Sequence, residues 1–440
     1  MSAIPTITSP TLSGRDRAGT ALAADNISLP RSISDNLFRV LVGVGLVLLL
    51  LTLVGAFAVS ARHAMAAYLV GLMTVLAVSL GGMFFTMIFH IVNAGWCVTL
   101  RRQFENLAGM MPVVAVLSLP FILGEVASSL GLIEGGMLMQ WITQRQEAGA
   151  GIIEAPYLLE KKAAFLNVPF WLIRCAVYLV VWVSIAKALK GLSVKQDATG
   201  DVAISRKLRY MSGWGLLAFA LTTAFVAFDW MMALDYRFFS TMWGVWYFAG
   251  AALSSLSCVA IVAFALKTTG RLDGAVTKEH FHDLAKLMFG FTVFWAYISY
   301  SQYFLIWYSN IPEETAFFVA RKENGWQYLY YLLAFGHFVV PFLILIFRPV
   351  KKAMLLVAVI AAWLLLMQVA DMVFVIRPVV YVREFAEASP GLGGIWLDAV
   401  GVLGVIAIYT GLLIRSIGRT PLIPTGDPRL NEALHHKNYV

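Results

Sequence analysis

Long apolar runs separated by polar connections dominate the chain. An α-helix rises about 1.5 Å per residue, so about 20 apolar residues cross the hydrocarbon core of a bilayer. Runs of that length occupy residues 37–59, 66–93, 109–132, 165–189, 211–235, 241–266, 286–309, 327–347, 352–376 and 395–415. The pattern predicts an all-α polytopic membrane protein with about ten transmembrane helices. None of the connections is long enough for an independent domain of ordinary size.

The polar ends set the predicted domain limits. Residues 1–35 are rich in Ser, Thr, Pro and Ala and are expected to form a flexible cytoplasmic tail. Residues 36–416 would be the ten-helix domain, and residues 417–440 a cytoplasmic C-terminal tail. The first apolar run is too long for a cleaved signal peptide and has no convincing A-x-A cleavage site, so we expect it to be retained.

Polar residues inside the runs suggest an internal repeat. Helices 2–5 and 6–9 are predicted to form two four-helix bundles, with the first and tenth helices flanking them. Asp229 and Asp371 lie in the last helix of each set, and Arg174 and His337 lie in the third.

Composition and charge support the membrane class. Of 440 residues, 60% are hydrophobic and 13% are charged, against about 25% charged in soluble domains. Most Lys and Arg residues lie in the tails and in the connections on the N-terminal side, which predicts cytoplasmic termini. The net charge of +8 follows this topology. No basic run is interleaved with exposed aromatic residues, so lipid and not nucleic acid is the expected surrounding partner.

The sequence offers little for binding a metal or a phosphate group. Its three cysteines are scattered, and it has no Gly-rich phosphate loop and no His or Cys cluster at metal-ligand spacing. His90 and His337 are expected at different depths, whereas a membrane haem b usually needs two matched histidines. We therefore expect no metal or covalent cofactor in this chain.

Several ionisable residues are predicted at membrane depth, where a charge costs about 2.5–3.5 kcal/mol on insertion scales. Two interpretations are open for each of them: a structural contact, such as an ion pair between Glu125 and Arg174, or a role in binding and proton transfer. Asp229 and Asp371 lack a cation on their own helices, which favours proton transfer. The ionisable candidates are His90 near the cytoplasmic end, His337 near the midplane, Glu125, Arg174, Asp229 and Asp371 in the outer half, and Asp235 at the outer rim. The neutral amide of Gln302, also in the outer half, is a further polar candidate.

The run FTVFWAYISYSQYFLIWYSNIPEE (Phe291 to Glu314) joins two of these features. Ser299 and Gln302 would lack hydrogen-bond partners in lipid, so they are expected to face a buried polar site. Glu313 and Glu314 close the run with an acidic turn. This turn predicts an extracytoplasmic docking point for a partner.

Four segments carry a family resemblance. The run HDLAKLMFGFTVFWAYISYSQYFLIWYSNIPEE from His282 resembles the polysulfide-reductase-type integral membrane subunits of alternative complex III. These belong to quinol-oxidising complexes of bacterial respiratory and photosynthetic membranes. FDWMMALDYRFFSTMWGVWYFAGA (Phe228 to Ala251) and ADMVFVIRP (Ala370 to Pro378) are similar to the same family. HIVNAGWCVTLRRQFENL (His90 to Leu107) resembles the smaller of its two ten-helix subunits.

The resemblance implies a subunit of a quinol:cytochrome c oxidoreductase in the bacterial cytoplasmic membrane. Its partners would be an extracytoplasmic iron–sulfur subunit, c-type cytochromes and the paralogous ten-helix subunit, which would hold the iron–sulfur clusters and haem c. Quinol or menaquinol would give up its electrons to those partners. Protons would leave through Asp229, Asp235 and His337, with Glu125, Arg174 and Asp371 lining the interior. If the complex also conserves energy, a proton path from the cytoplasmic side is needed, and His90 is the candidate for its entry.

Two other functional classes remain open from the residues alone. The intramembrane acids also suit a secondary transporter or ion channel, although the Pro120 and Pro169 interruptions have no counterpart in helices 7 and 8. A purely structural membrane anchor would explain the docking turn but not the buried acids.

Overall fold

The computed structural model describes all residues except 1–19, 134, 155, 323–324, 382–393 and 439–440. Its described part is helical and contains no β-strand, and nine of its helices are long and apolar enough to cross a membrane. A further helix, α11 (Lys278–Ser309), has the length to span but is rich in Tyr, Ser and Trp. The all-α, multi-span prediction is confirmed.

The bounds of the elements are as follows. The other long helices are α2 (Arg31–Ala58), α3 (Ala61–Ile91), α5 (Met111–Ser129), α8 (Val168–Thr199), α9 (Val202–Trp230), α10 (Trp243–Thr268), α16 (Met354–Ile376) and α17 (Ile395–Ile417). The shorter elements are α4 (Val98–Ala108), α6 (Gln140–Gly149), α7 (Tyr157–Lys161), η1 (Met232–Leu234), α12 (Pro312–Val319), α13 (Trp326–Leu332), η2 (Leu333–Val339), α14 (Val340–Leu345), α15 (Arg348–Lys352), η3 (Arg377–Tyr381) and α18 (Leu430–Leu434).

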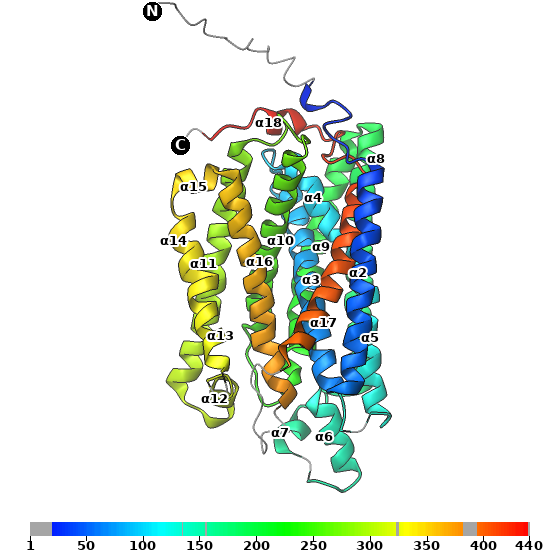
Figure 1. Ribbon diagram of the computed structural model, residues 1–440, viewed down its shortest axis with the longest axis vertical. Coiled ribbons are helices and arrows are strands. Elements are labelled where there is room, and N and C mark those ends of the chain that lie inside the picture. The colour runs from blue at the N-terminus through cyan, green and yellow to red at the C-terminus, as the bar shows by residue number, and fades with distance from the viewer. Residues whose placement is uncertain (1–19, 134, 155, 323–324, 382–393, 439–440) are drawn as a thin grey trace, which may run out of the picture.

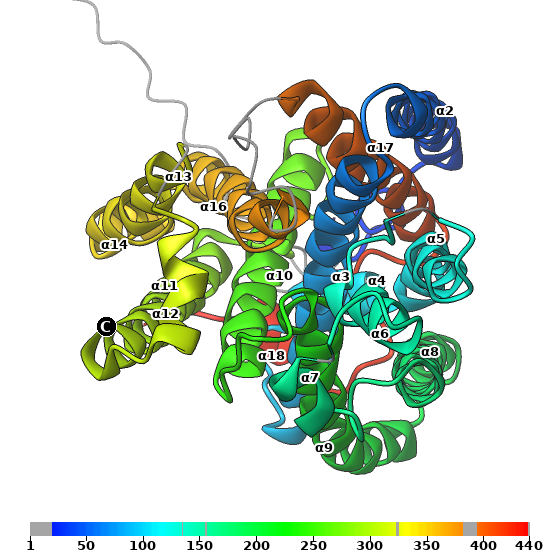
Figure 2. The ribbon, with the colours of Figure 1, turned by 90° about the horizontal axis from the view of Figure 1, so that it is seen from below.

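Two four-helix bundles stand side by side, as predicted. The first bundle is α3, α5, α8 and α9; the second is α10, α11, the α13–α14 span and α16 (Figure 2). The bundles meet where α3 packs against α10. A Cβ on Gly81 of α3 would lie 2.1 Å from the carbonyl oxygen of Ala251, so this close approach requires glycine. The flanking helices α2 and α17 pack against each other and against α3.

The helices are longer than the apolar runs at one end of the molecule. The segment between the apolar runs 165–189 and 211–235 is mostly helix: α8 continues to Thr199, and α9 begins at Val202 after Gly200, whose φ is +62°. The ends of both helices project beyond the apolar stretch, and polar residues form these ends. The two predicted helices are therefore correctly placed, but both are longer at this end than their apolar runs.

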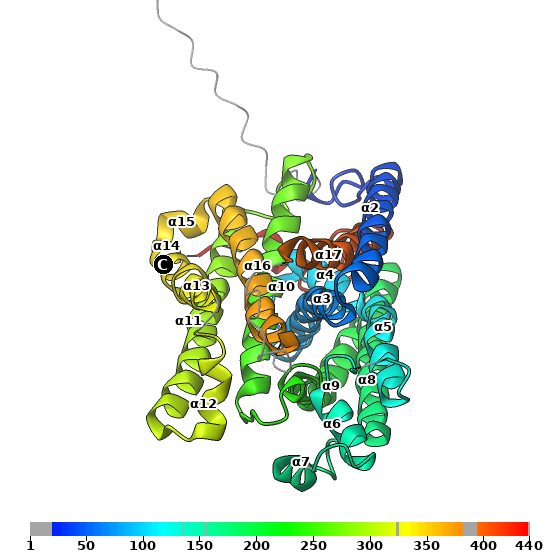
Figure 3. The same cartoon turned by 60° about the horizontal axis from the view of Figure 1, so that its bottom comes forward.

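Both described ends of the chain lie at the same end of the bundles, here called the termini face (Figure 1). Ile27 accepts a hydrogen bond from the Leu422 amide at 2.7 Å, and Gln103 donates to the Leu422 carbonyl at 2.8 Å. Residues 419–438, the C-terminal strap, continue across this face to the second bundle, where His436 contacts Asp283 at 2.6 Å. The opposite end, the loop face, carries α6, α7 and α12 (Figure 3).

The eighth span is not a uniform α-helix. It changes from α13 to a π-helical segment, η2, and then to α14. Pro341 follows η2 and has no N–H, so it cannot supply the α-helical hydrogen bond to the carbonyl four residues earlier, at His337. Such π segments often occur at functional sites. Here the segment carries His337.

Candidate functional site: an aromatic cavity in the second bundle

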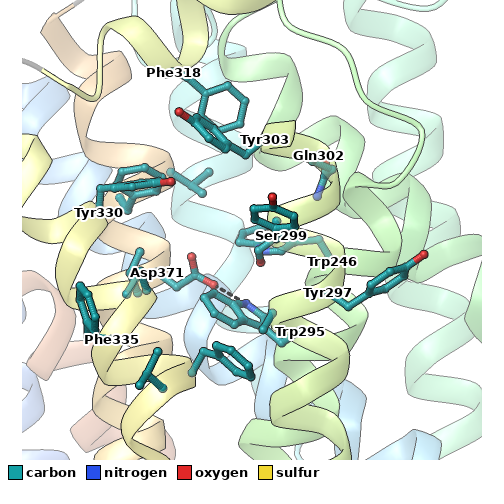
Figure 4. Close-up of a pocket in the computed structure, with 18 of the residues that line it drawn as sticks. Trp246, Trp295, Tyr297, Ser299, Gln302, Tyr303, Phe318, Tyr330, Phe335 and Asp371 are labelled. Carbon is teal, nitrogen blue, oxygen red and sulfur yellow. Dashed lines mark hydrogen bonds between the residues drawn. The ribbon is translucent and has the colours of Figure 1, made fainter. Parts of the chain in front are cut away.

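A cavity of about 510 Å³ lies between α10, α11, α12, α13, η2 and α16. This volume is in the range of small-molecule sites. Aromatic side chains form most of its walls (Figure 4), among them Trp246, Trp295, Tyr303, Phe318, Tyr330 and Phe335. Flat aromatic side chains suit a planar ring, which can stack on them or meet them edge-on.

One buried carboxylate lies at the cavity wall. Asp371 of α16 is only 3% exposed and accepts a hydrogen bond from the indole Nε1 of Trp295 at 2.9 Å (Figure 4). Trp295 comes from the facing helix α11, so the bond links two walls of the cavity. Among the described residues, no Lys, Arg or His forms an ion pair with Asp371. A carboxylate held in this way can accept a proton from a hydroxyl group placed in the cavity.

The predicted polar positions of α11 also reach this cavity. Gln302 and Ser299 both line it. The Gln302 carbonyl oxygen accepts a hydrogen bond from the Ser240 hydroxyl at 2.7 Å, while its amide nitrogen lies 3.4 Å from the Ile298 carbonyl. The Ser299 hydroxyl makes no hydrogen bond within the described chain. Both residues thus line the cavity, and their role in a binding site stays a prediction.

His337 does not line the cavity, but it contacts the lining residue Trp295. Its ring stacks on the Trp295 indole with centroids 3.8 Å apart and planes 27° apart. The imidazole is fully buried, and neither of its nitrogens forms a hydrogen bond with a described residue. Asp371, Gln302 and His337 thus form one group in the second bundle.

Arg174 and Asp229 form a separate group in the first bundle. Arg174 Nε and Nη2 donate to the Asp229 carboxylate at 2.8 and 2.7 Å, and the Tyr178 hydroxyl donates to it at 2.6 Å. The guanidinium also packs over the rings of Phe165 and Phe170, at 3.9 and 4.3 Å from their centroids. The cation that Asp229 lacks on its own helix comes from α8. Asp229 is therefore the ion-pair partner of Arg174.

The alternative of an ion pair between Glu125 and Arg174 is wrong. Instead, the Glu125 carboxylate accepts hydrogen bonds from the backbone amides of Leu138 and Met139, at 2.9 and 3.3 Å. These amides belong to the connection after α5, which returns over the loop face. Sequence spacing could not reveal this partner because the two amides are supplied by irregular backbone. The carboxylate fixes this connection to the first bundle.

Asp235 occupies the rim at the loop face, as expected from its position after α9. It accepts a hydrogen bond from Arg237 Nε at 2.9 Å. Lys162 lies close by and donates to the Tyr236 carbonyl at 2.5 Å. Burial lowers the pKa of the Lys162 ammonium, and the nearby Asp235 carboxylate opposes this shift. Asp235 is thus part of a rim cluster of charges, and it does not line the cavity.

His90 lies at the opposite end, in the last turn of α3 near the termini face. The His90 Nε2 atom is buried without a hydrogen bond to a described residue. The His90 backbone carbonyl accepts a hydrogen bond from Arg209 Nε at 3.4 Å. The helix that carries it belongs to the first bundle. The structure therefore does not bring His90 together with Asp371 or His337.

The acidic turn forms the first turn of α12, next to the cavity wall. Glu314 is partly buried, and the side chain of Glu313 lies outside the described residues. Docking at this turn stays a prediction. Phe317 and Phe318 of the same short helix line the cavity. Sequence reasoning missed this contribution and also Tyr330, for which the clustering of aromatic residues in 291–335 was the available signal. It also missed Ser240, for which the sequence offers no such signal.

Within the described chain, no three His, Cys, Asp or Glu side chains lie close enough together to hold a metal ion. Comparison with models of known protein families finds no matching family, and comparison with curated proteins finds no matching relative. The fold and the site therefore carry the functional argument. The chain is a multi-span helical membrane protein with an aromatic cavity and a buried carboxylate in its second bundle.

Proposed function

We propose that this chain is a membrane subunit of a quinol:electron-acceptor oxidoreductase and that its second bundle binds the quinol. The observation that carries the proposal is the placement of Asp371 in the wall of an aromatic cavity. A quinol headgroup is a planar aromatic ring with hydroxyl donors. Aromatic walls fit its faces, and a carboxylate that is already oriented by Trp295 fits one of its hydroxyl groups.

Quinol oxidation releases two protons and two electrons and leaves the quinone. Asp371 would take the proton of the hydroxyl group bound to it, acting as a general base. The electrons would pass one at a time to an iron–sulfur cluster or a c-type haem of a partner subunit. The chain's contribution is to bind the ring, orient the hydroxyl group and accept the proton.

The position of the cavity supports a partner at the loop face. Phe317 and Phe318 belong to α12 on that face, and Phe374 lies near the end of α16 there. An electron acceptor docked on the α12 turn, beside Glu314, would be close to the ring. The resemblance of the α9–α11 and α16 segments to alternative complex III favours the partner set of that complex: an extracytoplasmic iron–sulfur subunit, c-type cytochromes and a paralogous ten-helix subunit.

The proposal is tested by purifying the chain from native membranes in mild detergent through a tag. We expect c-type haem and iron–sulfur protein to co-purify, and quinol to reduce the haem. Asp371→Asn keeps an acceptor for Trp295 but removes the charge, so the complex should assemble and oxidise quinol about 10²-fold more slowly or worse. A solitary, colourless protein, or one that transports a solute when reconstituted alone, would reject the proposal in favour of a transporter.

A further inference from the structure

Two buried side chains of the second bundle have polar atoms without partners among the described residues. They are His337, which is 0% exposed, and Gln368, which is 1% exposed. Both ring nitrogens of His337 and both amide atoms of Gln368 lack a hydrogen bond to any described residue. Buried polar groups are almost always hydrogen-bonded, so four such atoms in one bundle require an explanation.

Both residues adjoin Asp371. Gln368 precedes Asp371 by one helical turn on α16, and a Cβ on Gly250 of α10 would lie 2.6 Å from the Gln368 carbonyl oxygen. His337 stacks on Trp295, whose indole nitrogen bonds to Asp371. His337 is thus linked to Asp371 through Trp295, and Gln368 lies on the neighbouring turn of the same helix, where side chains three residues apart share a face.

The mixture of donors and acceptors indicates the occupant. A neutral imidazole offers one donor and one acceptor, and an amide offers two donors and one carbonyl acceptor. Water both donates and accepts, and buried water commonly joins two to four such groups. A bound cation would find donors where it needs acceptors. An apolar tail would leave all four atoms unpaired.

We propose that ordered water joins His337 and Gln368 to Asp371 and carries a proton from Asp371 to His337. This step rests on the proposed function. The first hydroxyl of quinol gives its proton to Asp371, and the water passes that proton to a ring nitrogen of His337. Asp371 is then ionised again and accepts the proton of the second hydroxyl. The two electrons leave singly to the partner's iron–sulfur cluster or haem, so protons and electrons balance.

The assignment gives the two side chains different roles. His337 accepts the transferred proton. Gln368 is a positioning residue that holds the water and does not touch the quinol ring. Loss of either is expected to lower kcat for quinol oxidation while leaving KM unchanged, because neither lines the aromatic cavity.

The test begins with a cryo-EM map of the purified native complex at a resolution that shows ordered water. Density is expected between His337, Gln368 and Asp371. His337→Phe, which keeps the stack on Trp295, should lower kcat about 10²-fold, and Gln368→Leu should lower kcat and remove the density. Thr292→Val is the matched control and should match the wild type. Among the described residues, this buried hydroxyl bonds only to the Met288 carbonyl of its own helix, at 2.9 Å.

A well-resolved map without water at this place overturns the proposal, whether or not the variants fold. So does wild-type kcat in His337→Phe. Failure of the native complex to oxidise quinol would instead reject the proposed function, and the map would still decide whether the water is there. The two failures are therefore distinguishable.

Discussion

Arg174 and Asp229 form a buried, two-pronged ion pair between α8 and α9, with nitrogen–oxygen distances of 2.8 and 2.7 Å. Tyr178 adds a third hydrogen bond to the same carboxylate. All three contacts are donors to the Asp229 carboxylate. The sequence-based expectation of a proton-releasing Asp229 did not include this ion pair, which gives the residue a structural role.

Asp229→Asn is expected to destabilise the protein, because it leaves the Arg174 charge buried without its counter-ion. Breaking such a pair typically costs about 3–5 kcal/mol. Thermal unfolding of the detergent-purified protein measures the effect. A double variant, Arg174→Leu with Asp229→Leu, should recover part of the loss because no lone charge remains. Wild-type thermal stability in Asp229→Asn would contradict the structural role.

Filling the cavity should impair quinol oxidation without harming the fold. Ala296 lines the cavity from α11, so Ala296→Trp places an indole where the ring would bind. We expect KM for quinol to rise at least about 10-fold, since this change removes binding space in the free enzyme. Ala362→Trp on the exposed side of α16 is the control. Equal effects of the two substitutions on KM would argue against binding in the cavity.

Glu125 is expected to act on the loop-face connection and not on turnover. In Glu125→Ala the amides of Leu138 and Met139 lose their acceptor, at about 1–3 kcal/mol for each buried donor left unpaired. Hydrogen exchange of these two amides should become faster. Glu125→Gln keeps a carbonyl acceptor and should show a smaller change. Unchanged exchange in Glu125→Ala would mean that the carboxylate does not hold this connection.

The C-terminal strap should depend on the charge of Asp427, which bonds to the buried Arg101 of α4; Arg101 also bonds to Glu105, at 3.2 Å. Asp427→Ala leaves part of the buried guanidinium unpaired, so the strap should loosen and become more sensitive to limited proteolysis. Glu432→Gln breaks only a more exposed pair with Arg429 and is the control, because exposed pairs contribute about 0–1 kcal/mol. Equal cleavage of the two variants would contradict the anchoring role.

Hydropathy was sufficient to predict nine of the described long helices because each of them contains a continuous apolar stretch, and Asp229 and Asp371 lie in the last helix of each bundle. Depth alone could not predict partners. Arg174 lies at a depth similar to both Glu125 and Asp229, and only the packing of α8 against α9 selects Asp229. Irregular backbone was also beyond reach, as the Leu138 and Met139 amides and the π segment around His337 show.

The central claim is that quinol binds beside Asp371, and photolabelling tests it most directly. The purified native complex is illuminated with an azido-substituted quinone, and the labelled peptides are identified by mass spectrometry. The account predicts label in the peptides of α11 and α13 that carry Tyr303 and Tyr330, suppressed by excess unlabelled quinol and by Ala296→Trp. Label confined to partner subunits, or label in this chain that excess quinol does not suppress, would contradict it.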